Sequence, residues 1–218
     1  MTDSQAASAL AHQFEDLGQQ HEAASLGMWV FLATEVMFFG GLFAGYTIYR
    51  NLLPAGFAAG SHMLNVTIGA INTAVLIGSS LTMALAVRSA QIGKRNALLT
   101  FLILTMLLGL TFIILKLTLE WRHDYLEGLA PGLNFTNAGP NAKSVELFFC
   151  FYFIMTGVHA LHMVAGVGVL AFLWVQAWRG RYGPDRFNPV EGAGLYWHFV
   201  DIIWIFLFPL LYLIGGRY

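Results

Sequence analysis

The hydrophobic positions of this chain fall into five long stretches, separated by polar segments that contain glycine, proline or basic residues. Each stretch approaches or exceeds the roughly 20 residues that an α-helix needs to cross about 30 Å of hydrocarbon. Backbone amides in hydrocarbon must be hydrogen-bonded within the segment, and the alternating pattern of a membrane β-barrel is not present. We therefore predict an all-α polytopic membrane protein, a bundle of five transmembrane helices over residues 26–50, 65–88, 96–119, 145–178 and 191–214.

The segments outside these spans complete the predicted organisation. Residues 1–25 are polar and lack the basic start of a secretory signal, so we expect a polar N-terminal tail, partly helical, followed by a five-helix transmembrane domain over residues 26–218. Glycine and proline in residues 51–64 predict a break between the first two helices. Residues 121–144 are predicted to be the one long loop.

Composition supports a membrane protein and excludes other classes. Of the 218 residues, 57% are hydrophobic and only 11% are charged, which is too few for the wetted surface of a soluble domain. A net charge of -1 without a clustered basic face argues against nucleic-acid binding. The single cysteine, Cys150, rules out an intrachain disulfide framework and any cysteine-based metal motif.

Basic residues predict the orientation in the membrane, because positively charged short loops stay on the cytoplasmic side. Two short connectors are rich in lysine and arginine, and they hold Arg88, Lys94, Arg95, Arg179, Arg181 and Arg186. Both lie on the same side as the N-terminus in a five-helix topology. We therefore expect a cytoplasmic N-terminus and a periplasmic or extracellular C-terminus.

Ionisable side chains inside the spans are informative, because burying a charge in lipid costs a few kcal/mol. Glu35 lies roughly 14 Å along the first span, near the middle of the membrane. One interpretation is a protonated carboxyl that hydrogen-bonds a neighbouring helix. The other is a group that exchanges protons, senses lipid or borders a proton path.

Three histidines lie within the spans: His159 and His162, one turn apart on the fourth, and His198 on the fifth. A bis-histidine haem site needs one imidazole from each of two facing helices, so this set offers at most one pair, and that pair must include His198. We favour packed histidines that bond carbonyls, carboxyls or lipid head groups.

Polar positions on the fifth span predict an interior helix. Glu191, Gly194, His198 and, at the margin, Asp201 share one helical face, which we expect to look into protein. The helix should therefore lie against other spans rather than face lipid all round.

The second and third spans carry two further polar patterns. Asn65, Asn72 and Ser79 form a seven-residue polar stripe, which predicts interhelical hydrogen bonds. Lys116 and Glu120 are spaced to pair at i and i+4 near the outer end of the third span, which predicts an interfacial ion pair.

Motifs of independent catalytic centres are missing from the sequence. We find no glycine-rich phosphate loop, HExxH, CxxC or serine nucleophile elbow. The two halves also lack the inverted symmetry of many secondary transporters. We therefore expect no independent catalytic centre in this chain.

Four motifs give the chain a close resemblance to subunit III of haem-copper cytochrome c oxidases, which extends from Leu26 to Tyr212. They are TEVMFF at 34–39, INTAVL at 71–76, GVHALH at 157–162 and YWHFVDIIWIF at 196–206, the last being the most specific. The family has a seven-helix form and a five-helix form, common in bacteria, that lacks the first two helices. The chain resembles the five-helix form.

This resemblance implies a non-catalytic subunit of a respiratory terminal oxidase in the bacterial inner (cell) membrane. It implies a subunit that packs beside subunit I, associates with subunit II and other respiratory subunits, holds phospholipid, and supports proton uptake during oxygen reduction. It also implies that this chain itself holds no metal, haem or other redox cofactor, with haems and copper in the partner subunits. The residues that match the family's mid-membrane carboxyl and polar motif positions are Glu35, Asn72, His159, His162, Glu191, His198 and Asp201.

Several alternatives remain at this stage. The same family includes subunits of quinol oxidases and accessory proteins of nitric oxide reductases, and these motifs separate them poorly. From other classes, a small proton carrier could use Glu35 and Asp201, and a haem-bearing membrane anchor could use the histidines.

Overall fold

The computed structural model describes residues 17–136, 139, 141–184 and 186–213. Within these residues the secondary structure is helical, without a strand. Five of the helices are long and apolar enough to cross a membrane, which confirms the predicted fold class. The elements are α2 (Leu17–Leu52), α3 (Pro54–Met63), α4 (Val66–Gln91), α5 (Arg95–Leu115), η1 (Lys116–Trp121), α6 (Arg122–Leu126), α7 (Ala142–Trp178), α8 (Asn188–Phe208) and η2 (Pro209–Leu213), where η1 and η2 are π-helical.

The chain divides into two compact units, Met1–Phe38 and Phe39–Tyr218. The part of α2 before residue 39 belongs to the first unit, and the rest of α2 and the other helices belong to the second. Residues 17–25, which we assigned to the N-terminal tail, are already part of α2. The rest of that tail, residues 1–16, and residue 214 of the last predicted span lie outside the described residues.

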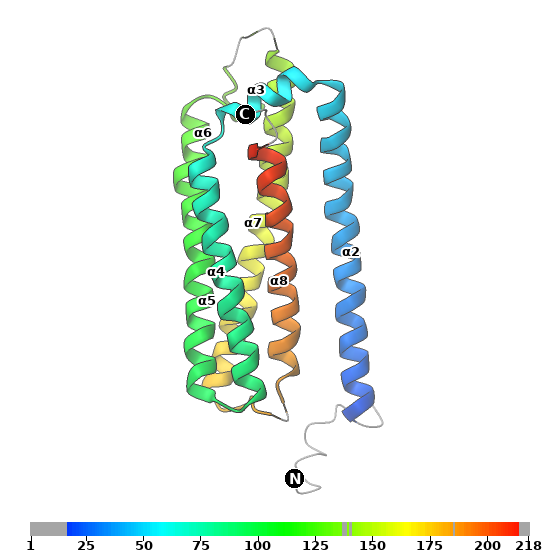
Figure 1. Cartoon of the computed structure of the whole chain (residues 1–218), viewed down its shortest axis with the longest axis vertical. Helices are drawn as coiled ribbons and strands as arrows, with labels where there is room; N and C mark the ends of the chain where they lie inside the picture. The colour runs from blue at the N-terminus through cyan, green and yellow to red at the C-terminus, as the bar shows by residue number, and fades with distance from the viewer. Residues whose placement is uncertain (1–16, 137–138, 140, 185, 214–218) are drawn as a thin grey trace, which may run out of the picture. The chain divides into compact units, whose positions relative to one another are not determined.

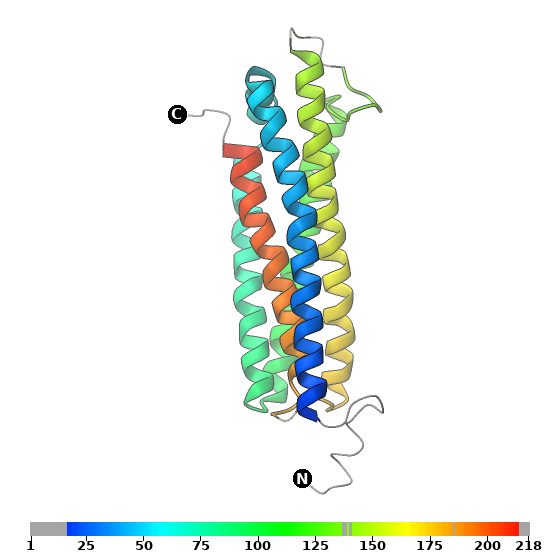
Figure 2. The same ribbon diagram turned by 90° about the vertical axis from the view of Figure 1, so that its right-hand side faces the viewer.

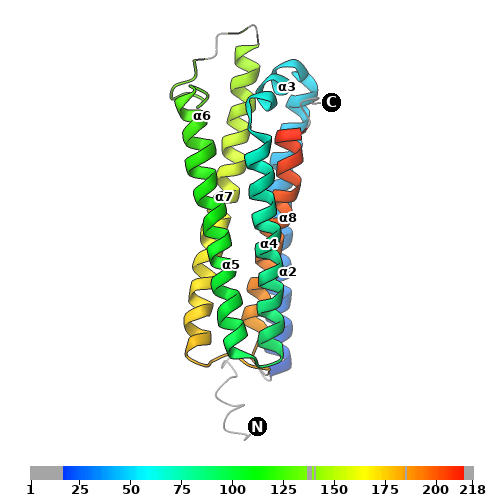
Figure 3. The ribbon, with the colours of Figure 1, turned by 60° about the vertical axis from the view of Figure 1, so that its left-hand side comes forward.

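Four helices of the second unit form a closed bundle (Figures 1, 2 and 3). Each packs against two others, in the order α4, α5, α7, α8 and back to α4. Short connections make chain neighbours antiparallel, and α3 and α6 lie at the same end of this bundle (Figures 1 and 3). We call this end the α3/α6 end.

Large aromatic side chains fill the centre of the bundle. Trp197, Trp204, Tyr152 and Phe112 are almost completely buried. Phe112 meets Trp204 edge to face, with ring centroids 4.7 Å apart, a favourable arrangement of the two ring quadrupoles. The four bundle helices therefore share one packed core.

The predicted break at residues 51–64 is present, since α2 ends at Leu52 and α4 begins at Val66, but most of this connector folds as a separate short helix, α3. Pro54 stands in the first turn, where a missing N–H is not needed. Gly56 and Gly60 allow α3 to lie directly on α7, since a Cβ at these positions would come within 2.2 Å of Ser144 Cβ and 2.4 Å of Phe148 Cδ1. The glycines mark close packing here, not a flexible loop.

The predicted loop at 121–144 is shorter than expected. The third membrane-crossing helix continues through η1 and α6 as far as Leu126. Gly128 then turns the chain with a φ of 71°, a left-handed conformation that suits glycine. Three charged residues of this extension, Lys116, Glu120 and Asp124, are buried within the bundle.

Substitution of Gly109 should test the close packing at the bundle centre. A Cβ on Gly109 would lie 2.7 Å from Trp197 Cη2, whereas a Cβ on Gly78, also within a helix, would meet nothing closer than 4.0 Å. We expect Gly109→Ala to destabilise the protein by about 1–3 kcal/mol through overpacking. Gly78→Ala is the matched control and should be neutral or slightly stabilising, because alanine favours helix. Thermal unfolding in detergent, followed by circular dichroism, measures both; equal stability of the two variants would contradict the packing described.

Candidate functional site

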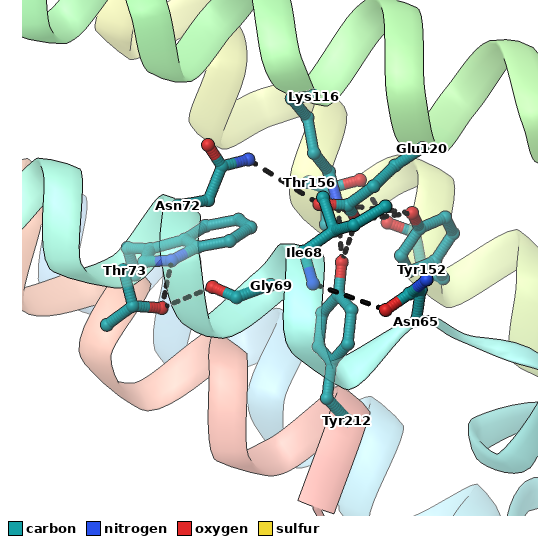
Figure 4. A network of polar contacts seen from close by, with 11 residues as sticks. Asn65, Ile68, Gly69, Asn72, Thr73, Lys116, Glu120, Tyr152, Thr156 and Tyr212 are labelled. Carbon is teal, nitrogen blue, oxygen red and sulfur yellow. Dashed lines mark hydrogen bonds and ion pairs between the residues drawn. The ribbon is translucent and has the colours of Figure 1, made fainter.

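Side chains from four parts of the bundle meet near the α3/α6 end (Figure 4). Lys116 and Glu120 come from η1, Tyr152 from α7, Tyr212 from η2 and Asn72 from α4. We call these five residues the polar cluster. Both π-helical segments contribute to it, and such wider turns often occur where a helix presents functional side chains.

Lys116 lies at the centre of the polar cluster. Its Nζ donates to Glu120 Oε2 at 2.6 Å, to Tyr212 Oη at 2.6 Å and to Tyr152 Oη at 3.1 Å. An ammonium group has three protons, so these three acceptors satisfy it completely. The side chain is only 1% exposed, and its charge also lies 4.6 Å from the centre of the Tyr152 ring.

The Glu120 carboxylate is compensated in the same way. Its Oε2 accepts from Lys116, from Tyr152 Oη at 3.3 Å and from Tyr212 Oη. Its Oε1 accepts from Asn72 Nδ2 at 3.5 Å. The side chain is 4% exposed, so the charge pair is held inside the protein by groups from α4, α7 and η2.

The sequence therefore predicted the Lys116 and Glu120 pair correctly but placed it wrongly. We expected an interfacial pair, whereas the structure buries both side chains. The two tyrosines are the reason, because they supply the hydrogen bonds that water would otherwise give. Sequence reasoning missed Tyr152 and Tyr212; they lie 36 and 96 positions from Lys116, and no spacing rule links them to it.

A second group of predicted residues lies farther along α8. His198 Nδ1 and Ser80 Oγ are 2.7 Å apart, which joins α8 to α4. Asp201 is 3% exposed and also lies beside Ser80. Gly194 and Asp201 are buried as predicted for an interior face, but Glu191 is exposed, because it occupies the first turn of α8 at the end of the helix.

The two histidines of α7 have separate surroundings. His159 is completely buried, with its ring 5.0 Å from that of Trp204 and 5.4 Å from that of Phe112. His162 Nδ1 lies 2.8 Å from the carbonyl oxygen of Val158, and its ring contacts that of Phe39 at 5.3 Å. His162 thus contacts a carbonyl as predicted, whereas the prediction is wrong for His159, whose two ring nitrogens have no hydrogen-bond partner among the described residues because aromatic rings surround it.

Glu35 lies on α2, in the first of the two compact units. The hydroxyl of the preceding residue, Thr34, donates to the carbonyl oxygen of Phe31 at 2.7 Å, within the same helix. Of the seven residues predicted from the sequence, only Asn72 belongs to the polar cluster. Among the described residues, no group of three or more His, Cys, Asp or Glu side chains could hold a metal ion.

The geometry of the polar cluster is that of a tie between helices. A single buried ion pair links α4, η1, α7 and η2 through hydrogen bonds that satisfy both charges. Removing one charge would leave the other unpaired in the protein interior, which is costly. The arrangement therefore holds the α3/α6 end of the bundle together.

The known proteins to which this chain is similar are named as subunit 3 of quinol oxidases or of cytochrome c oxidases. The family model "Cytochrome c oxidase subunit III" matches residues 18–216. The chain is 30% identical over 208 residues to cytochrome bo(3) ubiquinol oxidase subunit 3 of Pseudomonas aeruginosa, covering 92% of this chain and 93% of the relative. It is 30% identical over 190 residues to quinol oxidase subunit 3 of Bacillus subtilis, covering 87% and 86%. It is 32% identical over 189 residues to cytochrome c oxidase subunit 3 of Synechocystis sp., covering 86% and 74%.

Neutralising Glu120 should have a large effect on stability. We expect Glu120→Gln to cost about 3–5 kcal/mol, because it leaves the Lys116 charge buried without its counter-ion. Glu127→Gln is the matched control: Glu127 pairs with His123 at 3.3 Å on the surface, with side chains 50% and 61% exposed, so its loss should cost less than about 1 kcal/mol. Chemical denaturation in detergent gives both values.

A double-mutant cycle with Lys116→Met isolates the pair. The double variant should be less destabilised than the sum of the single variants, because it no longer contains an unpaired buried charge. Strict additivity would contradict the ion pair described.

Proposed function

Because the chain belongs to the cytochrome c oxidase subunit III family, whose members are subunits of terminal oxidase complexes, we propose that it is the non-catalytic subunit III of a respiratory haem-copper oxidase. In this proposal the oxygen chemistry takes place in a partner subunit that holds the haems and copper. The present chain stabilises subunit I, binds phospholipid and supports proton uptake. The multi-pass membrane fold is consistent with this role.

The observation that carries the proposal is the set of contacts made by two buried ionisable residues of the bundle, Lys116 and Glu120. Lys116 and Glu120 have their hydrogen-bonding groups engaged by Asn72, Tyr152, Tyr212 and each other. Charged groups satisfied in this way contribute to the stability of the bundle rather than to a reaction with a substrate. A structural subunit is the function that this geometry supports best.

The outward surface of α7 supports contacts with lipid or with a large partner subunit. Ile154, Leu161 and Phe172 are 53%, 68% and 61% exposed. At 100° per residue they lie on the same side of the helix, so they form one apolar stripe along it. A stripe of this kind suits hydrocarbon or the apolar face of another membrane helix.

The proposal covers both kinds of electron donor. The relatives include quinol oxidase subunits from Pseudomonas and Bacillus and a cytochrome c oxidase subunit from Synechocystis, at similar identities. We propose a bacterial inner-membrane location with a cytoplasmic N-terminus. This orientation rests on the basic residues of the short connectors, such as Arg88 and Arg179.

Purification through an affinity tag on this chain tests the assignment. We expect oxidase subunits I and II to co-elute, with the absorbance bands of haem in the complex and none in the isolated chain. A Soret band from the isolated chain would instead support a haem-bearing anchor. Elution of the chain without any oxidase subunit would contradict the proposal.

Glu35→Ala tests the proposed contribution of this residue to proton uptake. The haem content of the complex should be unchanged, because Glu35 holds no haem in this proposal. Turnover coupled to proton uptake, or its durability, should fall by less than about tenfold, equivalent to under about 1.4 kcal/mol of barrier. Glu22→Gln, a second carboxyl of α2, is the control and should leave turnover unchanged. Loss of haem from the Glu35→Ala complex would contradict this role.

A further inference from the structure

A small cavity adjoins the polar cluster at the α3/α6 end of the bundle. Its volume is about 50 Å³, and it is partly open to the surface. Its polar lining comes from Asn65, Glu120, His123, Asp124 and Tyr152, which lie between α3 and α4, on η1, on α6 and on α7. The cavity thus reaches from the surface to the buried carboxylate of the polar cluster.

Asp124 lines this cavity, and one oxygen of its carboxylate is left unsatisfied although Tyr152 of the polar cluster also interacts with the carboxylate. It is only 4% exposed, and its Oδ2 atom has no hydrogen-bond partner among the described residues. A buried carboxylate oxygen without a partner is costly, and in native structures such an atom calls for an explanation. Because Asp124 lines the cavity, a species bound there could supply the missing contact.

The charges around the cavity do not balance. Lys116 supplies one positive charge, and Glu120 and Asp124 supply two negative charges when ionised. All three protons of Lys116 are engaged by Glu120, Tyr152 and Tyr212, so none is directed at Asp124. Asp124 interacts electrostatically with Lys116, Glu120 and His123, and through a hydrogen bond with Tyr152. His123 is 61% exposed and pairs with Glu127, so one buried negative charge remains without a close counter-ion.

The size and the donor atoms of the cavity restrict what could compensate this charge. A water-sized species needs at least roughly 10–15 Å³, so about 50 Å³ accommodates a very few such species. Carboxylate and phenol oxygens are hard donors, which favour hard cations over soft transition metals. A single missing positive charge points to a monovalent ion.

We propose that this cavity binds one small, hard monovalent cation, such as Na⁺, between Asp124 and Glu120. The bound cation neutralises the excess negative charge beside Lys116 and satisfies Asp124 Oδ2. It would also connect the start of α4 at Asn65 to η1 and α6, and so close the α3/α6 end. This inference does not depend on the proposed oxidase function, because it concerns only the stability of this end of the bundle.

Hydrogen–deuterium exchange of the purified full-length protein, with any subunits that co-purify, in sodium chloride and in choline chloride at equal ionic strength and fixed pH, tests the proposal. Choline carries its charge on a quaternary nitrogen shielded by methyl groups, so carboxylate oxygens cannot coordinate it as they coordinate a bare ion. If the site is lost when this end opens, sodium slows amide exchange in residues 116–129 by a factor of one plus the ratio of its concentration to its dissociation constant. The slowing is roughly tenfold when sodium is at about nine times that constant. Equal exchange in the two salts would overturn the proposal.

Asp124→Asn tests whether Asp124 is the residue through which sodium slows exchange. The neutral amide removes the uncompensated charge, so this variant should assemble and should exchange at the same rate in sodium and in choline. Glu127→Gln is the matched control, because Glu127 is a carboxyl of the same region, half exposed and paired with His123; it should keep the full sodium effect. A sodium effect that survives in Asp124→Asn, or a protection that depends on pH and not on sodium, would overturn the proposal.

Asp124→Glu provides a second variant should Asp124→Asn fail to assemble. It keeps the charge but places an additional methylene in a cavity of about 50 Å³. We expect it to raise the sodium concentration needed for half-maximal protection by several-fold. An unchanged sodium dependence in this variant would also overturn the proposal.

Discussion

The buried ion pair between Lys116 and Glu120 is the interaction on which the α3/α6 end of the bundle depends. Two opposite charges taken out of water are expensive unless every proton and lone pair finds a partner. Here Tyr152, Tyr212 and Asn72 supply those partners, and each comes from a different element. Satisfying the pair therefore requires α4, η1, α7 and η2 to be in place together, so the electrostatics of two residues specify the arrangement of four segments.

Close packing and local helix geometry make that arrangement possible. Both π-helical segments, η1 and η2, carry residues of the polar cluster, and the wider turn changes which side chains point inward. Glycines provide the close approach of neighbouring elements, as at Gly60, where α3 lies against Phe148 of α7. Aromatic rings then fill the remaining space, and the charged groups are enclosed by Trp204, Tyr152 and Tyr212. The hydrogen bonds of the buried charges and the close packing of apolar side chains thus depend on the same arrangement of helices.

This organisation fits a subunit that contributes structure to an oxidase. The interior charges of Lys116 and Glu120 are directed at other helices of the same chain, while the outer side of α7 carries an apolar stripe from Ile154 to Phe172. In hydrocarbon there is little hydrophobic drive between helices, so internal hydrogen bonds and fitted side chains must hold the bundle together. Such a chain can present a stable apolar surface to lipid and to a partner subunit. The family relationship and the geometry are both compatible with the structural role proposed for this chain.

The sequence alone determined the fold class, the five membrane-crossing helices and the family, because hydrophobic length and local motifs are properties of contiguous residues. It also indicated the Lys116 and Glu120 pair, whose spacing is local. Only the tertiary structure decided that this pair is buried, that α3 is a helix packed on α7, and that Glu191 is exposed. Tyr152, Tyr212 and Asp124 could not be assigned beforehand, because their roles arise from contacts between distant segments that no periodicity in the chain encodes.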